Sequence, residues 1–166
     1  MAARYALIAL LTVACGSAAP AARAGYEVLD LLVGHWDVRV KTLKPVPAEV
    51  TYSEKYEWVL DHKYLRGQTF GKPDGTEDIS FGTYDAKADG YPLWIFSSTG
   101  TFTYLAPATW DARTRTMEWN NPPASDVYYN TKVVFTDKGR HWTVLVKDWK
   151  GVVLLHQEGG AVRRGK

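Results

Sequence analysis

The side chains most suited to catalysis or metal binding are few and lie far apart in the sequence. The four histidines, His35, His62, His141 and His156, do not have the close spacing that zinc ligands show. The chain has no Gly-x-Ser-x-Gly elbow, no Gly-rich phosphate loop and no His-Glu-x-x-His pair. We therefore predict no metal site and no enzyme activity from a local motif. A catalytic site dispersed along the chain leaves no such motif and stays open.

One carboxylate falls among apolar residues. Alternate positions of the segment 49–60 are apolar or aromatic, namely Val50, Tyr52, Tyr56, Trp58 and Leu60. This period of two predicts a strand with one buried face, and Glu54 belongs to that face. A buried carboxylate is costly unless it is paired or hydrogen-bonded. We expect Glu54 to lie at the wet mouth of a barrel. The alternative is that Glu54 orients the polar end of a ligand.

The same segment predicts a hairpin with the residues that follow it. Asp61 and His62 can form a two-residue turn into the segment 63–71. This register places Trp58 opposite Leu65, Tyr56 opposite Gly67 and Glu57 opposite Arg66. An aromatic ring over a strand glycine and a pair of opposite charges both favour that register.

Nearer the N-terminus, a change in the spacing of the apolar residues marks the start of the first predicted strand. The segment "YEVLDLLVG" has the spacing of a short helix that Gly34 ends, and alternation of apolar and polar residues starts at Trp36. Val38 and Val40 share the face of Trp36. In a closed sheet, Gly34 permits a tight turn from helix to strand, and the Trp36 ring can plug the end of the barrel.

Turn signals recur every eight to twelve residues along the rest of the chain, and no convincing helix lies between them. We expect strands at 35–41, 49–60, 63–71, 79–84, 91–98, 101–106, 116–120, 127–135, 141–147 and 152–158. About ten short strands joined by tight turns predict an all-β, antiparallel, up-and-down barrel. The positions expected to face its interior are Val38, Val40, Val50, Tyr52, Glu54, Tyr56, Trp58, Val127, Tyr129, Val133 and Phe135. These side chains either line a ligand cavity or fill the core.

The N-terminal residues have the composition of a targeting segment. Arg4 precedes the apolar run 5–14, and Ala22-Arg23-Ala24 fits signal peptidase, so we predict a secretory signal over 1–24. The alternative is a lipoprotein anchored through Cys15, the only cysteine. We assign 25–160 to one barrel domain and 161–166 to a basic tail. We expect a periplasmic or secreted protein without a transmembrane segment after cleavage.

The charge of the predicted mature chain excludes one class of partner. The segment 1–24 contains two arginines and no acidic residue, so its removal lowers the formal charge from +2 to 0. A nucleic-acid-binding face would need a basic stripe, which the sequence lacks. Since the predicted mature chain has no cysteine, an exported barrel would depend on its core rather than on disulfides. The sequence leaves the oligomeric state open.

Four motifs occur in an order that is similar to a known group. "LDLLVGHWDV", "YEWVLDHKYLRGQ", "TYDAKADGYPLWIFSSTG" and "TWDARTRTMEW" resemble an uncharacterised family of exported bacterial lipocalin-like proteins in the calycin superfamily, which includes nitrobindin-like barrels. The resemblance implies a lipocalin-like barrel of about ten strands with a short N-terminal helix, and no settled function. Nitrobindin-like relatives hold haem through a histidine near the chain end, which points to His156 as an axial ligand.

Three functional hypotheses follow. The first is a non-enzymatic carrier or sensor of a small apolar or aromatic ligand, bound without a cofactor. The second is a structural or interaction module whose barrel is filled by side chains, and a cavity of several hundred cubic ångströms would count against it. The third is a haem-binding barrel with His156 as axial ligand.

Overall fold

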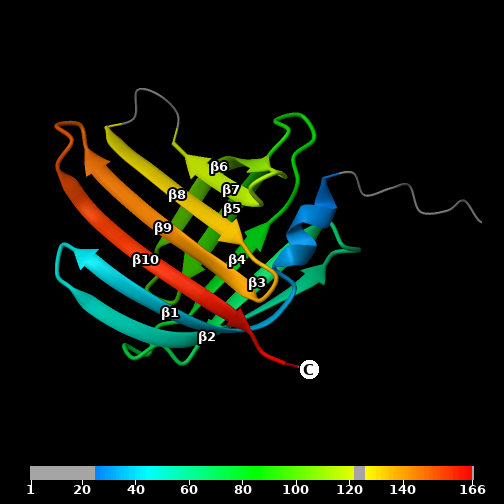
Figure 1. Ribbon diagram of the computed structural model, residues 1–166, viewed down its shortest axis with the longest axis horizontal. Helices are drawn as coiled ribbons and strands as arrows, with labels where there is room; N and C mark the ends of the chain where they lie inside the picture. Colours follow the sequence, from blue (N-terminus) through cyan, green and yellow to red (C-terminus); the bar gives the residue numbers. More distant parts are fainter. Residues whose placement is uncertain (1–24, 122–125, 166) are drawn as a thin grey trace, which may run out of the picture.

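Ten antiparallel strands form one closed barrel in a computed structural model that describes residues 25–121 and 126–165 (Figure 1). Each strand pairs with the next along the chain, and β1 pairs with β10 to close the sheet. The strands are β1 (Gly34–Lys44), β2 (Ala48–Val59), β3 (Tyr64–Phe70), β4 (Asp78–Gly82), β5 (Tyr91–Ser97), β6 (Phe102–Asp111), β7 (Thr116–Asn120), β8 (Val127–Phe135), β9 (Gly139–Asp148) and β10 (Val153–Arg163). The predicted fold class is confirmed, and the predicted signal segment lies outside the described residues.

The β2–β3 hairpin has the register predicted from its cross-strand pairs. Trp58 pairs with Leu65, and Glu57 pairs with Arg66, with which it also forms an ion pair on the outer face. Tyr56 lies over Gly67, where an added Cβ would come within 2.5 Å of the tyrosine ring. The register is therefore fixed by one ring that only glycine admits and by one pair of opposite charges.

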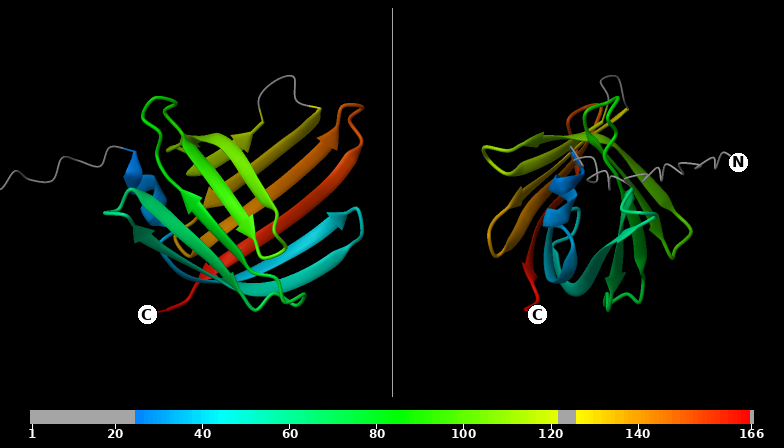
Figure 2. Two further views of the ribbon diagram at one scale, coloured as in Figure 1. Left: turned by 180° about the vertical axis from the view of Figure 1, so that it is seen from behind. Right: turned by 90° about the vertical axis from the view of Figure 1, so that its right-hand side faces the viewer.

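A short helix covers one end of the barrel. The helix η1 (Tyr26–Leu31) is a 3-10 helix of six residues, so the predicted helix is shorter and tighter than its spacing indicated. Leu29 is buried in the core, and Asp30 accepts a hydrogen bond from Trp58 Nε1 at 2.6 Å. Gly34 then turns the chain into β1 with a φ of 125°, which favours glycine. The right-hand view of Figure 2 shows η1 lying across this end of the barrel.

Trp36 occupies the seam between the first and last strands. Its side chain is 2% exposed and packs with Ala161 of β10. Its Nε1 donates to the Leu32 carbonyl at 2.7 Å. The guanidinium groups of Arg140 and Arg163 lie 4.5 and 4.6 Å from the indole ring. The ring is thus held by apolar packing, one hydrogen bond and two cation–π contacts.

The C-terminal end of the barrel lies further along the chain than predicted. We expected a basic tail over 161–166, but β10 continues to Arg163 and Ala161 is buried. Arg164 donates its backbone N–H to the His35 carbonyl at 2.9 Å and forms an ion pair with Asp37. These two arginines therefore belong to the barrel and not to a tail: Arg163 lies over the Trp36 ring and donates to the Leu31 carbonyl, whereas Arg164 pairs with Asp37 on the outer face.

The two ends of the barrel differ. By the up-and-down order, the β1–β2, β3–β4, β5–β6, β7–β8 and β9–β10 connections all lie at the end away from η1. The left-hand view of Figure 2 shows the β1–β2 and β9–β10 turns on that side. We call the end covered by η1 the closed end and the opposite one the open end.

Two neighbouring glycines of β10 provide a test of this packing. A Cβ at Gly159 would lie 2.1 Å from the Trp142 ring, whereas the nearest neighbour of a Cβ at Gly160 is 3.8 Å away. We expect Gly159→Ala to lower the free energy of unfolding by about 1–3 kcal/mol, because the indole must move. Gly160→Ala should leave it within about 0.5 kcal/mol. Urea unfolding of both variants measures the difference, and equal losses would contradict the packing described.

Candidate ligand-binding cavity

A cavity of about 610 Å³ occupies the interior of the barrel. Its volume is in the range of small-molecule sites. Among the described residues, η1 and every strand except β1 contribute to its wall, which is mostly apolar or aromatic. Leu29 and Leu65 border it toward the closed end, and Val146 and Leu155 toward the open end. A cavity of this size contradicts the hypothesis of a barrel filled by its own side chains.

The predicted inward positions divide into two groups. Those that border the cavity are Tyr52, Glu54, Tyr56, Val127, Tyr129, Val133 and Phe135. Val38 and Val40 are buried but do not border it, so the expectation that they line a ligand cavity is not met. The reason is that Val50, Tyr52, Tyr56 and Trp142 pack over their inner side. Trp58 instead packs at the closed end, where its ring is 6.3 Å from that of Tyr26 on η1.

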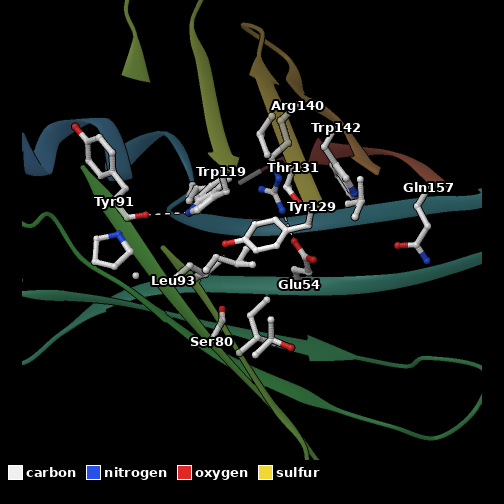
Figure 3. A pocket seen from close by; sticks show the side chains of 18 of the residues that line it. Glu54, Ser80, Tyr91, Leu93, Trp119, Tyr129, Thr131, Arg140, Trp142 and Gln157 are labelled. Carbon is white, nitrogen blue, oxygen red and sulfur yellow. Dashed lines mark hydrogen bonds and ion pairs between the residues drawn. The ribbon is translucent and has the colours of Figure 1, made fainter. Parts of the chain in front are cut away.

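The wall contains one buried ion pair. Glu54 is 8% exposed and Arg140 6% exposed, and Arg140 Nη2 donates to Glu54 Oε2. Both residues border the cavity, and Figure 3 shows them reaching toward each other. Glu54 therefore does not lie at the wet mouth where we expected it. It is tolerated in the interior because a cation from β9 neutralises it.

Aromatic rings surround the Arg140 guanidinium. The rings of Trp36, Tyr56 and Trp142 lie 4.5, 5.2 and 5.7 Å from it. Its Nη1 is buried and has no hydrogen-bond partner in the described part of the chain. The ring faces stabilise the charge, but they do not replace an acceptor for this N–H group.

Two tyrosines share the environment of the ion pair. Burial raises the pKa of Tyr52 and that of Tyr56, and the negative charge of Glu54 raises both further. At the closed end, burial raises the pKa of Tyr91 to about 12, and its hydroxyl donates to the Gly25 carbonyl at 2.8 Å. These hydroxyls therefore remain neutral donors at physiological pH.

Tyr129 contacts the part of the barrel wall where the short strand β7 leaves β6 without a partner. β7 has five residues and β6 has ten, so the first half of β6 has no β7 partner. The Tyr129 hydroxyl accepts a hydrogen bond from the Ala106 N–H at 3.2 Å. Asn121 accepts from the Tyr129 N–H at 2.9 Å. Side chains thus satisfy backbone groups here that a longer β7 would have paired.

Sequence reasoning missed Arg140 and most of the β9 wall. The predicted strand begins at His141, two residues after the start of β9 at Gly139, so the prediction assigns Arg140 to no face. The signal was present, since Arg140 has the same parity as Trp142, Val144 and Val146, which all border the cavity. Trp119 was also missed, although its Nε1 donates to the Tyr91 carbonyl at 2.9 Å (Figure 3).

His156 does not fit the predicted role of an axial haem ligand. Leu155 and Gln157, its neighbours in β10, both border the cavity, so His156 points to the outer face. Its Nε2 lies 4.0 Å from Glu158 Oε1. None of the described residues that border the cavity is a histidine. No group of three or more His, Cys, Asp or Glu side chains suited to a metal ion occurs among residues 25–121 and 126–165.

Fold and cavity together define a closed β-barrel with an apolar interior of ligand size. No protein-family model matches the chain, and neither does any curated protein. Among solved structures, the S-type phycobiliprotein lyase CPES from Guillardia theta is similar, with 13% identity and a TM-score of 0.48 over 84% of this chain and 92% of the lyase chain. An identity this low carries no information about ligand or activity. No helix in the described part of the chain is long and apolar enough to cross a bilayer.

Removal of the buried cation should cost stability. Arg140→Met leaves the Glu54 carboxylate buried without a partner, and we expect it to lower the free energy of unfolding by about 3–5 kcal/mol. The double variant Glu54→Leu/Arg140→Met removes both charges and should recover most of that loss. Urea unfolding of wild type, single and double variants gives the coupling. A double variant as unstable as Arg140→Met would show that the pair is not the source of the loss.

The buried tyrosines predict a loss of stability in alkali. An unfolded tyrosine ionises near pH 10, whereas the raised pKa values of Tyr52 and Tyr56 keep them protonated in the folded protein. The folded state therefore binds more protons above about pH 10, and the free energy of unfolding falls as pH rises further. Urea unfolding between pH 8 and about 11.5 should show this slope. Tyr52→Phe should reduce it, while Tyr128→Phe, at an exposed position, should leave it unchanged.

Proposed function

We propose that this protein binds a small, largely apolar molecule inside its barrel. The observation that carries the proposal is the cavity of about 610 Å³, whose wall is mostly apolar and aromatic and contains one polar cluster. Cavities of this kind bury most of the surface of a small ligand, and a few polar groups fix its orientation. The proposed activity is binding without turnover.

The polar cluster favours a neutral ligand. Glu54 and Arg140 cancel each other's charge, and Tyr52 and Tyr56 remain neutral. A ligand carboxylate would add an unbalanced negative charge to a buried site, which is unfavourable. A carbonyl, ester or hydroxyl oxygen would instead offer an acceptor to Arg140 Nη1, which has none among the described residues.

Export belongs to the same proposal. The apolar run 5–14 and the small residues before Gly25 support cleavage after residue 24 and action in the periplasm or outside the cell. Lipidation at Cys15 is the alternative route to the same side of the membrane. By either route, the barrel would bind its ligand outside the cytoplasm.

Binding can be measured with a matched pair of fluorescent probes, cis-parinaric acid and its methyl ester. We expect the ester to bind with at least about tenfold higher affinity than the acid at pH 7, because only the acid brings a net charge into the cavity. Val144→Trp should weaken ester binding at least about tenfold, since the indole would occupy the cavity that Val144 borders. Thr143→Trp, at the adjacent exposed position, is the control and should bind as wild type does.

Two results would count against this function in different ways. If neither probe binds and native mass spectra of the purified protein show no ligand, the binding proposal is overturned. Tighter binding of the acid would leave a binding protein but overturn the preference for a neutral ligand. Equal losses in Val144→Trp and Thr143→Trp would place the probe outside the barrel.

A further inference from the structure

Exposed apolar side chains gather at the open end of the barrel. Eleven of the thirteen large hydrophobic residues that are exposed in the described part of the chain lie at that end, namely Val46, Phe70, Ile79, Phe96, Phe102, Tyr104, Val127, Tyr128, Trp149, Val152 and Leu154. The other two, Leu60 and Val162, lie at the closed end. Both ends consist of strand ends and turns, so the difference is not a general property of loops. We call the eleven residues the apolar rim.

The apolar rim surrounds the open end instead of forming a patch on one side. Each of the five strand connections at this end carries at least one rim residue, inside the connection or in the strand next to it. The most exposed of them, Val46, Phe102 and Trp149, come from three different connections. Ring contacts link neighbouring strands, as between Phe96 and Phe102, whose centroids are 6.3 Å apart. A ring of this kind can meet a flat surface on several sides at once, whereas a single patch suits one small partner.

The rim is continuous with the cavity. Val127 belongs to the rim, is 42% exposed and also borders the cavity. Thr103 lies between Phe102 and Tyr104 in β6, is exposed and also borders the cavity. A surface that covers the rim therefore covers the mouth through which an apolar molecule would enter or leave.

The depth of the apolar rim matches the boundary region of a lipid bilayer. Tyr104 is the third residue of β6, so the rim extends about 7 Å along this strand at roughly 3.3 Å per residue. Interfacial proteins bury their apolar groups about 5–10 Å into the boundary between headgroups and acyl chains. Aromatic side chains such as Trp149 and Tyr128 are the types that favour this region.

The charged residues at the open end indicate which kind of lipid surface the apolar rim would contact. The connections at the open end, 45–47, 71–77, 98–101, 121–126 and 149–152, contain two lysines and three acidic residues in the sequence. Attraction to anionic lipid needs a cluster of basic residues, which these connections lack. Lys150 Nζ lies 4.7 Å from the Trp149 ring, and its flexible stem allows the ammonium to stay in water while the indole enters the lipid.

We propose that the apolar rim docks on the surface of a zwitterionic lipid bilayer, with the mouth of the cavity facing the lipid. The proposal goes beyond ligand binding, because it assigns the surface from which the protein takes its ligand or to which it delivers it. Large exposed apolar surfaces on soluble domains mark interaction sites of this kind. Hydrophobic insertion supplies the affinity, so binding does not depend on lipid charge.

Flotation with phosphatidylcholine vesicles tests the proposal on the full mature protein. We expect the protein to float with the vesicles, and its apparent affinity to change less than about twofold between 0.1 and 0.5 M NaCl. The double variant Phe102→Ser/Trp149→Ser should bind at least about tenfold more weakly, because two large side chains no longer enter the lipid. The control is Leu60→Ser/Val162→Ser, which removes two exposed apolar side chains, 71% and 63% exposed, from the closed end and should bind as wild type does.

Three outcomes would overturn the proposal. The first is that the protein does not float with the vesicles. The second is that it floats only with vesicles of anionic lipid and no longer does so in high salt. The third is that the rim variant and the control variant lose the same amount of vesicle affinity. Light scattering after size exclusion identifies the competing occupant, since a dimer that the rim variant disrupts would assign the rim to a second copy of the chain. Parinaric ester binding without vesicles separates this proposal from the ligand-binding function. A protein that binds the ester and does not float keeps its function and loses only the docking surface.

Discussion

Pairing between β1 and β10 is the constraint on which the barrel depends. Without it, both strands would be unpaired edges, and the cavity would lose one side of its enclosure. Trp36 stabilises this seam, because it packs against Ala161 and lies beside the guanidinium groups of Arg140 and Arg163. Since Arg140 also pairs with Glu54 on β2, one group of rings and charges joins β1, β2, β9 and β10. The seam is thus held by side chains as well as by the backbone ladder.

The same group of side chains decides where the cavity lies. Tyr52, Tyr56 and Trp142 pack inward over β1, so the space that remains is bounded by the other nine strands and η1. The ion pair has a second effect there, because it places hydrogen-bonding groups in an apolar wall without adding net charge. A structural element that closes the sheet therefore also sets the polarity of the site.

Much of the fold could be predicted from the sequence, because the barrel is built from local patterns. Alternation at 35–41 and 49–60 and regular turn signals identify the strands, and the ring of Tyr56 over Gly67 fixes a register. The site was only partly predictable. Parity tells which residues face inward, but not which inward residues cover others, so Val38 and Val40 could not be separated from Tyr52 and Tyr56. The partner of Glu54 lies 86 residues away in the sequence, and no local pattern links it to Arg140.

The seam joins the beginning of the folded chain to its end, which has a consequence for the order of assembly. Trp36 pairs with Arg163, so the contact that completes the ring spans almost the whole domain. During synthesis from the N-terminus, β1 has only β2 beside it until β10 has left the ribosome. Contacts this distant in sequence form late, since a long loop must close first. Vectorial synthesis thus keeps the nascent sheet open, with β1 as an edge strand, until β10 is available to pair with it.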